Sequence, residues 1–86
     1  DPQYNVTREG RFSGGKLTAQ IFVESGHIRD IHFYGDFFAK EGLEQLSAAL
    51  VGCRYEPSAI REALEQLHAQ DYFYQITLDE LFSCII

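Results

Sequence analysis

The hydrophobic pattern of this chain changes its period at one junction, Gly35-Asp36-Phe37-Phe38. Before the junction, apolar and polar residues alternate, which is typical of strands with one buried face. After it, from Lys40 onward, apolar residues recur every three to four positions, as they do on one face of a helix. A sheet that is followed only by helices must bury its apolar face under them. The sequence therefore predicts an α+β fold, with strands over about residues 4–35 and helices over about residues 40–86.

Three strands are expected before the junction, over residues 4–12, 16–24 and 28–34. Glu24-Ser25-Gly26-His27 supplies a hairpin turn, because Gly26 can adopt a positive φ. In the second and third strands, one face carries Leu17, Ala19, Ile21, Val23, Ile31 and Phe33. The other face carries Thr18, Gln20, Glu24, Asp30, His32 and Tyr34. The alternation predicts a three-stranded antiparallel meander with one apolar face.

About three helices are expected after the junction, packed on that apolar face as the second layer of a two-layer sandwich. The first has an apolar stripe of Leu43, Leu46, Leu50 and Val51, and Gly52 can end it. Pro57 suits the first turn of the second helix, which buries Ile60, Ala63, Leu64 and Leu67. Thr77-Leu78-Asp79-Glu80 is a capping box that begins the third. The aromatic segment 71–75 is expected to lie across the core of this single domain, residues 1–86.

Charge and composition exclude several classes of function. The formal net charge is −6, and the seven basic residues are scattered along the chain, which argues against nucleic acid as a partner. No apolar run approaches the roughly 18–20 residues that span a bilayer, so no membrane partner is expected. Cys53 and Cys84 lie among apolar neighbours, which favours buried free thiols and a cytoplasmic location. A start at Asp1-Pro2 in a chain without Met suggests a fragment of a longer chain.

Two motifs suggest ligand sites and are rejected. Gly10 to Lys16 matches most of a phosphate-binding loop, but Leu17 stands where a Ser or Thr must bind magnesium, and a strand follows in place of a helix. His27 and His32 are five residues apart on one strand, which predicts opposite faces, and His68 is distant. We therefore predict no catalytic residue, no cofactor-binding residue and no metal site in this chain.

Asp36 is the polar residue with the strongest claim to a role. One interpretation is structural: its carboxylate caps backbone N–H groups at the turn and complements a nearby helix N-terminus. The other is functional: Asp36, Phe37 and Phe38 form a contact with a partner or ligand. Because two adjacent side chains of an extended segment point to opposite sides, Phe37 and Phe38 cannot both be buried.

The ordered motifs also resemble a known family. They are Gly15-Lys16-Leu17, Gly26-His27-Ile28, Gly35-Asp36-Phe37-Phe38, Leu50-Val51-Gly52-Cys53-Arg54-Tyr55 and Tyr72-Phe73. Together they cover nearly the whole chain and are similar to the C-terminal accessory domain of bacterial lipoate–protein ligases. That resemblance implies a fold like the SufE and NifU iron–sulfur scaffolds. It also implies a role in the ATP-dependent activation of lipoate to lipoyl-AMP, which precedes transfer to a lysine of a lipoyl domain.

The resemblance implies that the large catalytic domain of the ligase supplies the catalytic groups. ATP, magnesium and lipoate are expected in the full ligase, and none is expected to be bound by this domain alone. The partner is then the large domain, in cis or in trans, and the lipoyl-domain acceptor is reached through the full enzyme. The large domain's Arg-Arg-x-x-Gly-Gly-Gly motif is missing here, so no catalytic residue is assigned. The alternative is a free-standing interaction or scaffold module of the same fold, for which Cys53 is the candidate reactive thiol.

Overall fold

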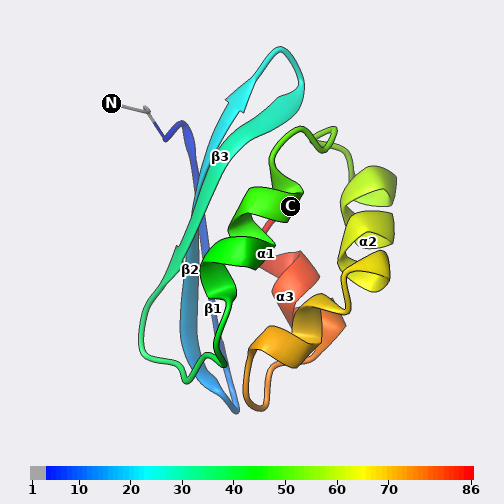
Figure 1. Ribbon diagram of the computed structural model, residues 1–86. Coiled ribbons are helices and arrows are strands. Elements are labelled where there is room, and N and C mark those ends of the chain that lie inside the picture. The colour runs from blue at the N-terminus through cyan, green and yellow to red at the C-terminus, as the bar shows by residue number, and fades with distance from the viewer. Residues whose placement is uncertain (1–3) are drawn as a thin grey trace.

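The computed structural model describes residues 4–86. The elements follow in the order β1 (Val6–Phe12), β2 (Gly15–Glu24), β3 (His27–Tyr34), α1 (Leu43–Leu50), α2 (Pro57–Gln66), the 3₁₀ turn η1 (Ala69–Tyr72) and α3 (Leu78–Ser83). The three strands form an antiparallel sheet in the order β1-β2-β3. All helices lie on one side of this sheet, as Figure 1 shows. The predicted α+β fold, a meander followed by helices on one face, is confirmed.

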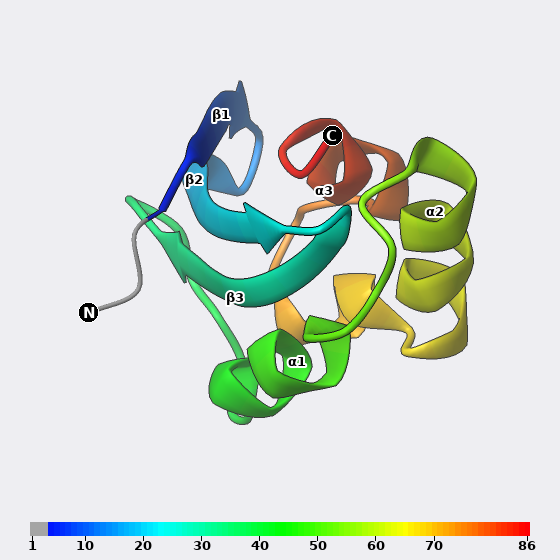
Figure 2. The ribbon, with the colours of Figure 1, turned by 90° about the horizontal axis from the view of Figure 1, so that it is seen from above.

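The helices divide the sheet face between them. Helix α1 packs against β3 and α3 packs against β1, while α2 contacts α3 and η1. In Figure 2 the helix α2 accordingly lies farthest from the sheet. Between the two layers lies one core, to which the central strand contributes Leu17, Ala19 and Ile21, all fully buried. The helices contribute Leu46, Leu50, Ile60, Leu64, Leu81 and Ile85.

A β-bulge changes the face assignment of β3. Val23 pairs with Ile28 but Phe22 pairs with Asp30, so Arg29 is an extra residue in β3. The extra residue returns Ile28 to the core side, where it is fully buried. His27 and His32, which pair with Glu24 and Gln20, therefore share the outer face. The prediction that these two histidines lie on opposite faces was wrong, because it counted an uninterrupted strand.

Two further burial predictions were also wrong. Thr18, expected on the exposed face, is only 4% exposed because its cross-strand neighbours Glu9 and Tyr34 flank it on the central strand. Val51, expected in the apolar stripe of α1, is 46% exposed. Helix α1 ends at Leu50, and the backbone of Val51 is already extended before Gly52 takes a φ of +94°. The extended backbone turns the Val51 side chain away from the buried stripe.

The sequence signals for the starts of α2 and α3 are confirmed. Pro57 occupies the first turn of α2, where its missing N–H is not needed. In α3, the Thr77 hydroxyl accepts a hydrogen bond from the Glu80 N–H at 3.1 Å. The Glu80 carboxylate in turn accepts one from the Thr77 N–H at 2.9 Å. The predicted capping box is therefore confirmed, and it fixes the start of the helix that covers β1.

Candidate functional site

The junction between strands and helices is held in an extended form by neighbours from both ends of the chain. The Lys16 N–H donates to the Asp36 carbonyl at 3.0 Å, which ties the junction to the start of β2. The Lys40 N–H donates to the Tyr72 carbonyl at 2.8 Å, and the Tyr74 N–H donates to the Phe38 carbonyl at 3.0 Å. Figure 1 shows the β1–β2 turn, this junction and the segment after η1 meeting at the lower end of the molecule.

Glycines allow these segments to approach so closely. A Cβ atom at Gly15 would lie 1.8 Å from the Asp36 carbonyl oxygen, and one at Gly14 would lie 2.3 Å from the Tyr74 carbonyl oxygen. The Gly-rich stretch that resembles a phosphate-binding loop is thus a tight turn whose glycines pack against backbone. It is followed by β2 instead of a helix, as predicted.

The two adjacent phenylalanines point in opposite directions, as predicted. Phe37 is half-buried and its ring centroid lies 5.4 Å from that of Phe73. Phe73 is itself buried and also meets Phe33 edge-on, at 5.8 Å between ring centroids. Phe38, in contrast, is 77% exposed. Phe37 therefore anchors the junction to the core, and Phe38 is free to contact another molecule.

Asp36 does not cap a helix. Helix α1 begins only at Leu43, its N-cap is Gly42, and no side chain caps it. Within residues 4–86, the exposed Asp36 carboxylate makes no hydrogen bond, whereas the backbone carbonyl of Asp36 accepts one from the Lys16 N–H. The structural interpretation of Asp36 as a cap was wrong, because the chain stays extended through Lys40 before it turns into the helix.

Sequence reasoning missed Tyr74, which completes the exposed surface around Phe38. Ala39 bridges Phe73 in antiparallel fashion, which places Phe38 opposite Tyr74 on the exposed side of the pair. Tyr74 is 54% exposed, and the Lys40 ammonium lies 5.1 Å from the centre of its ring, within the range of a cation–π contact. We call Phe38, Lys40 and Tyr74 the aromatic ledge. The segment 71–75 was expected to lie across the core. Phe73 is buried in the core and Tyr72 packs partly against it, whereas Asp71, Tyr74 and Gln75 are exposed.

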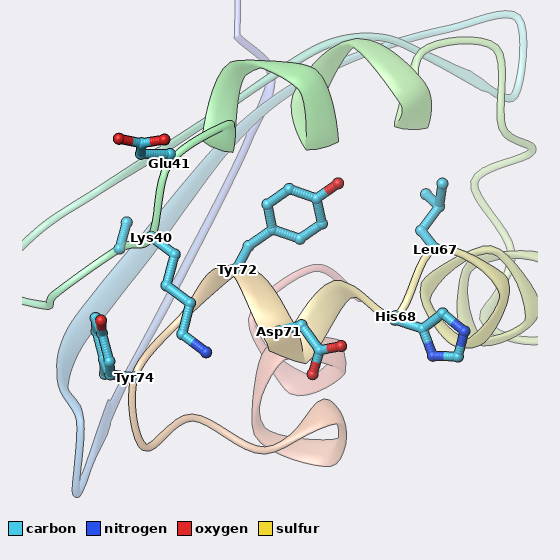
Figure 3. A pocket seen from close by; sticks show the side chains of 8 residues that line it. Lys40, Glu41, Leu67, His68, Asp71, Tyr72 and Tyr74 are labelled. Atoms are coloured by element: carbon cyan, nitrogen blue, oxygen red, sulfur yellow. The ribbon is translucent and has the colours of Figure 1, made fainter.

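A hollow of about 710 Å³ adjoins the aromatic ledge. Figure 3 shows Lys40 and Tyr74 at one end of it and Leu67 and His68 at the other, with Tyr72 and Asp71 between them. His68 takes a left-handed φ of +50° at the N-cap of η1, which places its ring at this rim. The hollow is wide enough to receive side chains of a partner.

The remaining candidate groups do not assemble into a reactive centre. Within residues 4–86, no three His, Cys, Asp or Glu side chains lie close enough together to hold a metal ion. His32 stacks on Tyr34 with ring centroids 5.8 Å apart. Both cysteines are free, Cys84 is buried and Cys53 is half-buried. Desolvation raises the pKa of the Cys53 thiol, so this group lacks the depressed pKa of an activated thiol.

The family model described as bacterial lipoate protein ligase C-terminus matches residues 1–85. The chain belongs to this family. The lipoate–protein ligase of Streptococcus pyogenes is 35% identical over 80 residues, which are 93% of this chain and 24% of that protein. Lipoate–protein ligase 1 of Staphylococcus aureus is 36% identical over 81 residues, covering 94% of this chain and 25% of that protein. The chain thus spans about a quarter of the length of these ligases.

A solved structure has the fold of this lipoate ligase C-terminal domain. It comes from work on an archaeal lipoylation system, a bi-partite lipoate protein ligase and its E2 lipoyl domain from Thermoplasma acidophilum. The two chains superpose with a TM-score of 0.80, covering 94% of this chain and 93% of that chain at 17% identity. No helix within residues 4–86 of our domain is long and apolar enough to cross a membrane.

A sulfur-handling scaffold on this fold needs a reactive thiol, which gives a test at Cys53. Because burial raises the pKa of the Cys53 thiol, we expect its alkylation by iodoacetamide at pH 7.5 to be slower than that of free cysteine. The rate should rise as the pH increases through the thiol's raised pKa, since the thiolate is the nucleophile. Mass spectrometry of the Cys84→Ala variant isolates the Cys53 rate. Alkylation faster than that of free cysteine would favour the scaffold interpretation.

Proposed function

We propose that this domain supports the activation of lipoate by ATP in a lipoate–protein ligase and contributes no catalytic group itself. The observation that carries the proposal is the match to the ligase C-terminus over residues 1–85, in a chain that spans only about a quarter of its relatives. ATP, magnesium and lipoate then bind to the remainder of the ligase. The lipoyl domain that receives the lipoyl group is reached through that remainder as well, and the reaction takes place in the cytoplasm.

The catalytic domain is the direct partner, either in the same chain or as a separate subunit. The separate arrangement is supported by the structural neighbour, which belongs to a bi-partite ligase and is nearly as short as this chain. We propose that contact with the catalytic domain is made at the junction that contains Asp36, Phe37 and Phe38. In the structure Asp36 and Phe38 are exposed there, and Phe37 supports them from the core.

Water exclusion gives this role a physical basis. Adenylation joins a carboxylate to a phosphoryl group and forms a mixed anhydride that water can hydrolyse. A domain that covers such a site removes bulk water, which strengthens the electrostatic interactions within the site and protects the intermediate. A covering domain needs shape and a docking surface for this task, and it needs no reactive side chains.

Comparison of the two half-reactions tests the proposal. We expect the intact ligase to catalyse lipoate-dependent exchange between ATP and pyrophosphate, and the ligase without this domain to lose that exchange. Transfer of the lipoyl group from supplied lipoyl-AMP to a lipoyl domain should persist, because the adenylate has already been made. Addition of the separate domain serves as the control for damage to the catalytic domain. Exchange that continues at the full rate without the domain would overturn the proposed function.

A further inference from the structure

We propose that the aromatic ledge of Phe38, Lys40 and Tyr74 binds an apolar segment of the catalytic domain, with the adjoining hollow receiving its side chains. The inference rests on the proposed function and specifies which side chains near the junction make the contact. It also changes the residues expected to make that contact. Lys40 and Tyr74 are added to the contact residues, and Phe37, which packs on Phe73, supports the surface from the core.

The two aromatic side chains are already placed for binding. Phe38 and Tyr74 are 77% and 54% exposed, and one hydrogen bond between their backbones holds them on facing segments. Aromatic residues with few rotatable bonds lose little conformational entropy when they are covered, so they are frequent anchors of interfaces. The tight glycine contacts at Gly14 and Gly15 restrict movement of both segments. The ledge is therefore a preorganised apolar anchor.

The charge around the ledge is mixed. The chain carries a net charge of −6, and four of its basic residues pair with carboxylates within the chain. Within residues 4–86, Lys40 forms no ion pair and lies over the Tyr74 ring instead. Two carboxylates, Glu41 and Asp71, line the same hollow, so neither sign of charge dominates there. Apolar contacts at Phe38 and Tyr74 are therefore expected to contribute most of the binding.

The outer face of the sheet fits such a partner less well. Several of its polar groups pair with one another: Lys16 pairs with Glu9 at 3.3 Å, and the Tyr4 hydroxyl donates to Asp30 at 2.9 Å. Its exposed ring, Tyr34, already stacks on His32. The hollow beside His32 has a volume of about 110 Å³, against about 710 Å³ for the one beside the ledge. The aromatic ledge thus combines the more exposed aromatic side chains with the larger hollow.

A photo-crosslink in the intact ligase tests the contact directly. p-Benzoylphenylalanine placed at Phe38 should crosslink to peptides of the catalytic domain, and mass spectrometry would identify an apolar segment. The same probe at Val51, exposed after the far end of α1, is the matched control and should give no such product. Crosslinks at Val51 but not at Phe38 would overturn the inference and assign the contact to another face.

Exchange kinetics separate this inference from the proposed function. We expect Phe38→Ala and Tyr74→Ala to reduce lipoate-dependent ATP–pyrophosphate exchange by about tenfold each, the effect typical of an interface anchor. Val51→Ala should leave exchange unchanged. If deletion of the domain abolishes exchange and the ledge variants do not, the inference fails while the proposed function stands. If deletion has no effect, the proposed function fails, and the crosslink at Phe38 still decides where the domains touch.

Discussion

A Gly15→Ala variant is expected to lose about 3–5 kcal/mol of folding stability, the first of two large effects that the structure predicts. The added Cβ would lie 1.8 Å from the Asp36 carbonyl oxygen, which is a backbone atom that cannot rotate away. Relief of this clash requires movement of the junction and loss of the 3.0 Å hydrogen bond from Lys16 to Asp36. Alanine is also strained at the φ of +119° that Gly15 adopts.

Two glycines provide matched controls for the backbone strain alone. Gly26 and Gly52 have φ values of +76° and +94°, but no atom lies within 4 Å of a Cβ built on either. Gly26→Ala and Gly52→Ala should therefore cost only about 1–2 kcal/mol. Urea unfolding followed by circular dichroism would measure all three. Equal losses at Gly15 and Gly26 would show that φ strain dominates and that the close approach to Asp36 is relieved at little cost.

The consequence at Gly15 is large because the total stability is small. A domain of 86 residues has a free energy of unfolding of roughly 4–13 kcal/mol. A loss of 3–5 kcal/mol could leave a substantial unfolded fraction at 37 °C. The Gly-rich turn at the start of β2 is thus a requirement of the fold, although its sequence resembles a ligand-binding loop.

The element order was predictable because it depends on local patterns. Alternation in β2, the 3.6-residue stripes of α1 and α2, and the capping box at Thr77 each report on a few neighbouring residues. The bulge at Arg29 was not predictable in this way. The residues on either side of the bulge each keep a regular alternation of apolar and polar side chains. Only the pairing of Ile28 with Val23 shows that residues before and after Arg29 face different sides than an uninterrupted strand would give.

The candidate surface was predictable in part, for a related reason. Gly35-Asp36-Phe37-Phe38 stood out in the sequence, and the opposite directions of Phe37 and Phe38 followed from the geometry of an extended chain. Tyr74 comes from a distant segment and joins Phe38 only through the bridge between Ala39 and Phe73. A long-range pairing of two residues has no periodic signal in one sequence. The role expected for Asp36 failed for the opposite reason: a local capping pattern was inferred where the helix begins farther along.

Phe73→Ala is expected to be the second large effect, with a loss of about 3–5 kcal/mol. Phe73 is 3% exposed and contacts both Phe33 and Phe37, at 5.8 and 5.4 Å between ring centroids. Alanine leaves a cavity among these rings. Backbone pairing holds the segments that carry Phe33 and Phe37 in place, so their side chains cannot move far enough to fill the cavity. Phe73→Leu should cost less, because most of the buried volume remains. Thermal or urea unfolding would rank the two variants, and equal stability of Phe73→Ala and the wild type would contradict the assigned packing.

Comparison of neighbouring variants then separates stability from contact. Tyr74→Ala removes an exposed ring, so its loss of stability should stay near 0.5 kcal/mol, while the ledge loses an anchor. Phe73→Ala should lower stability strongly, and should lower exchange only to the extent that the backbone ladder supporting Phe38 loosens. If the exchange rates of these two variants follow their stabilities, the surface acts only through folding. If exchange falls with Tyr74→Ala at unchanged stability, the exposed ring itself contributes to activation, and the core beneath it serves to hold that ring in place.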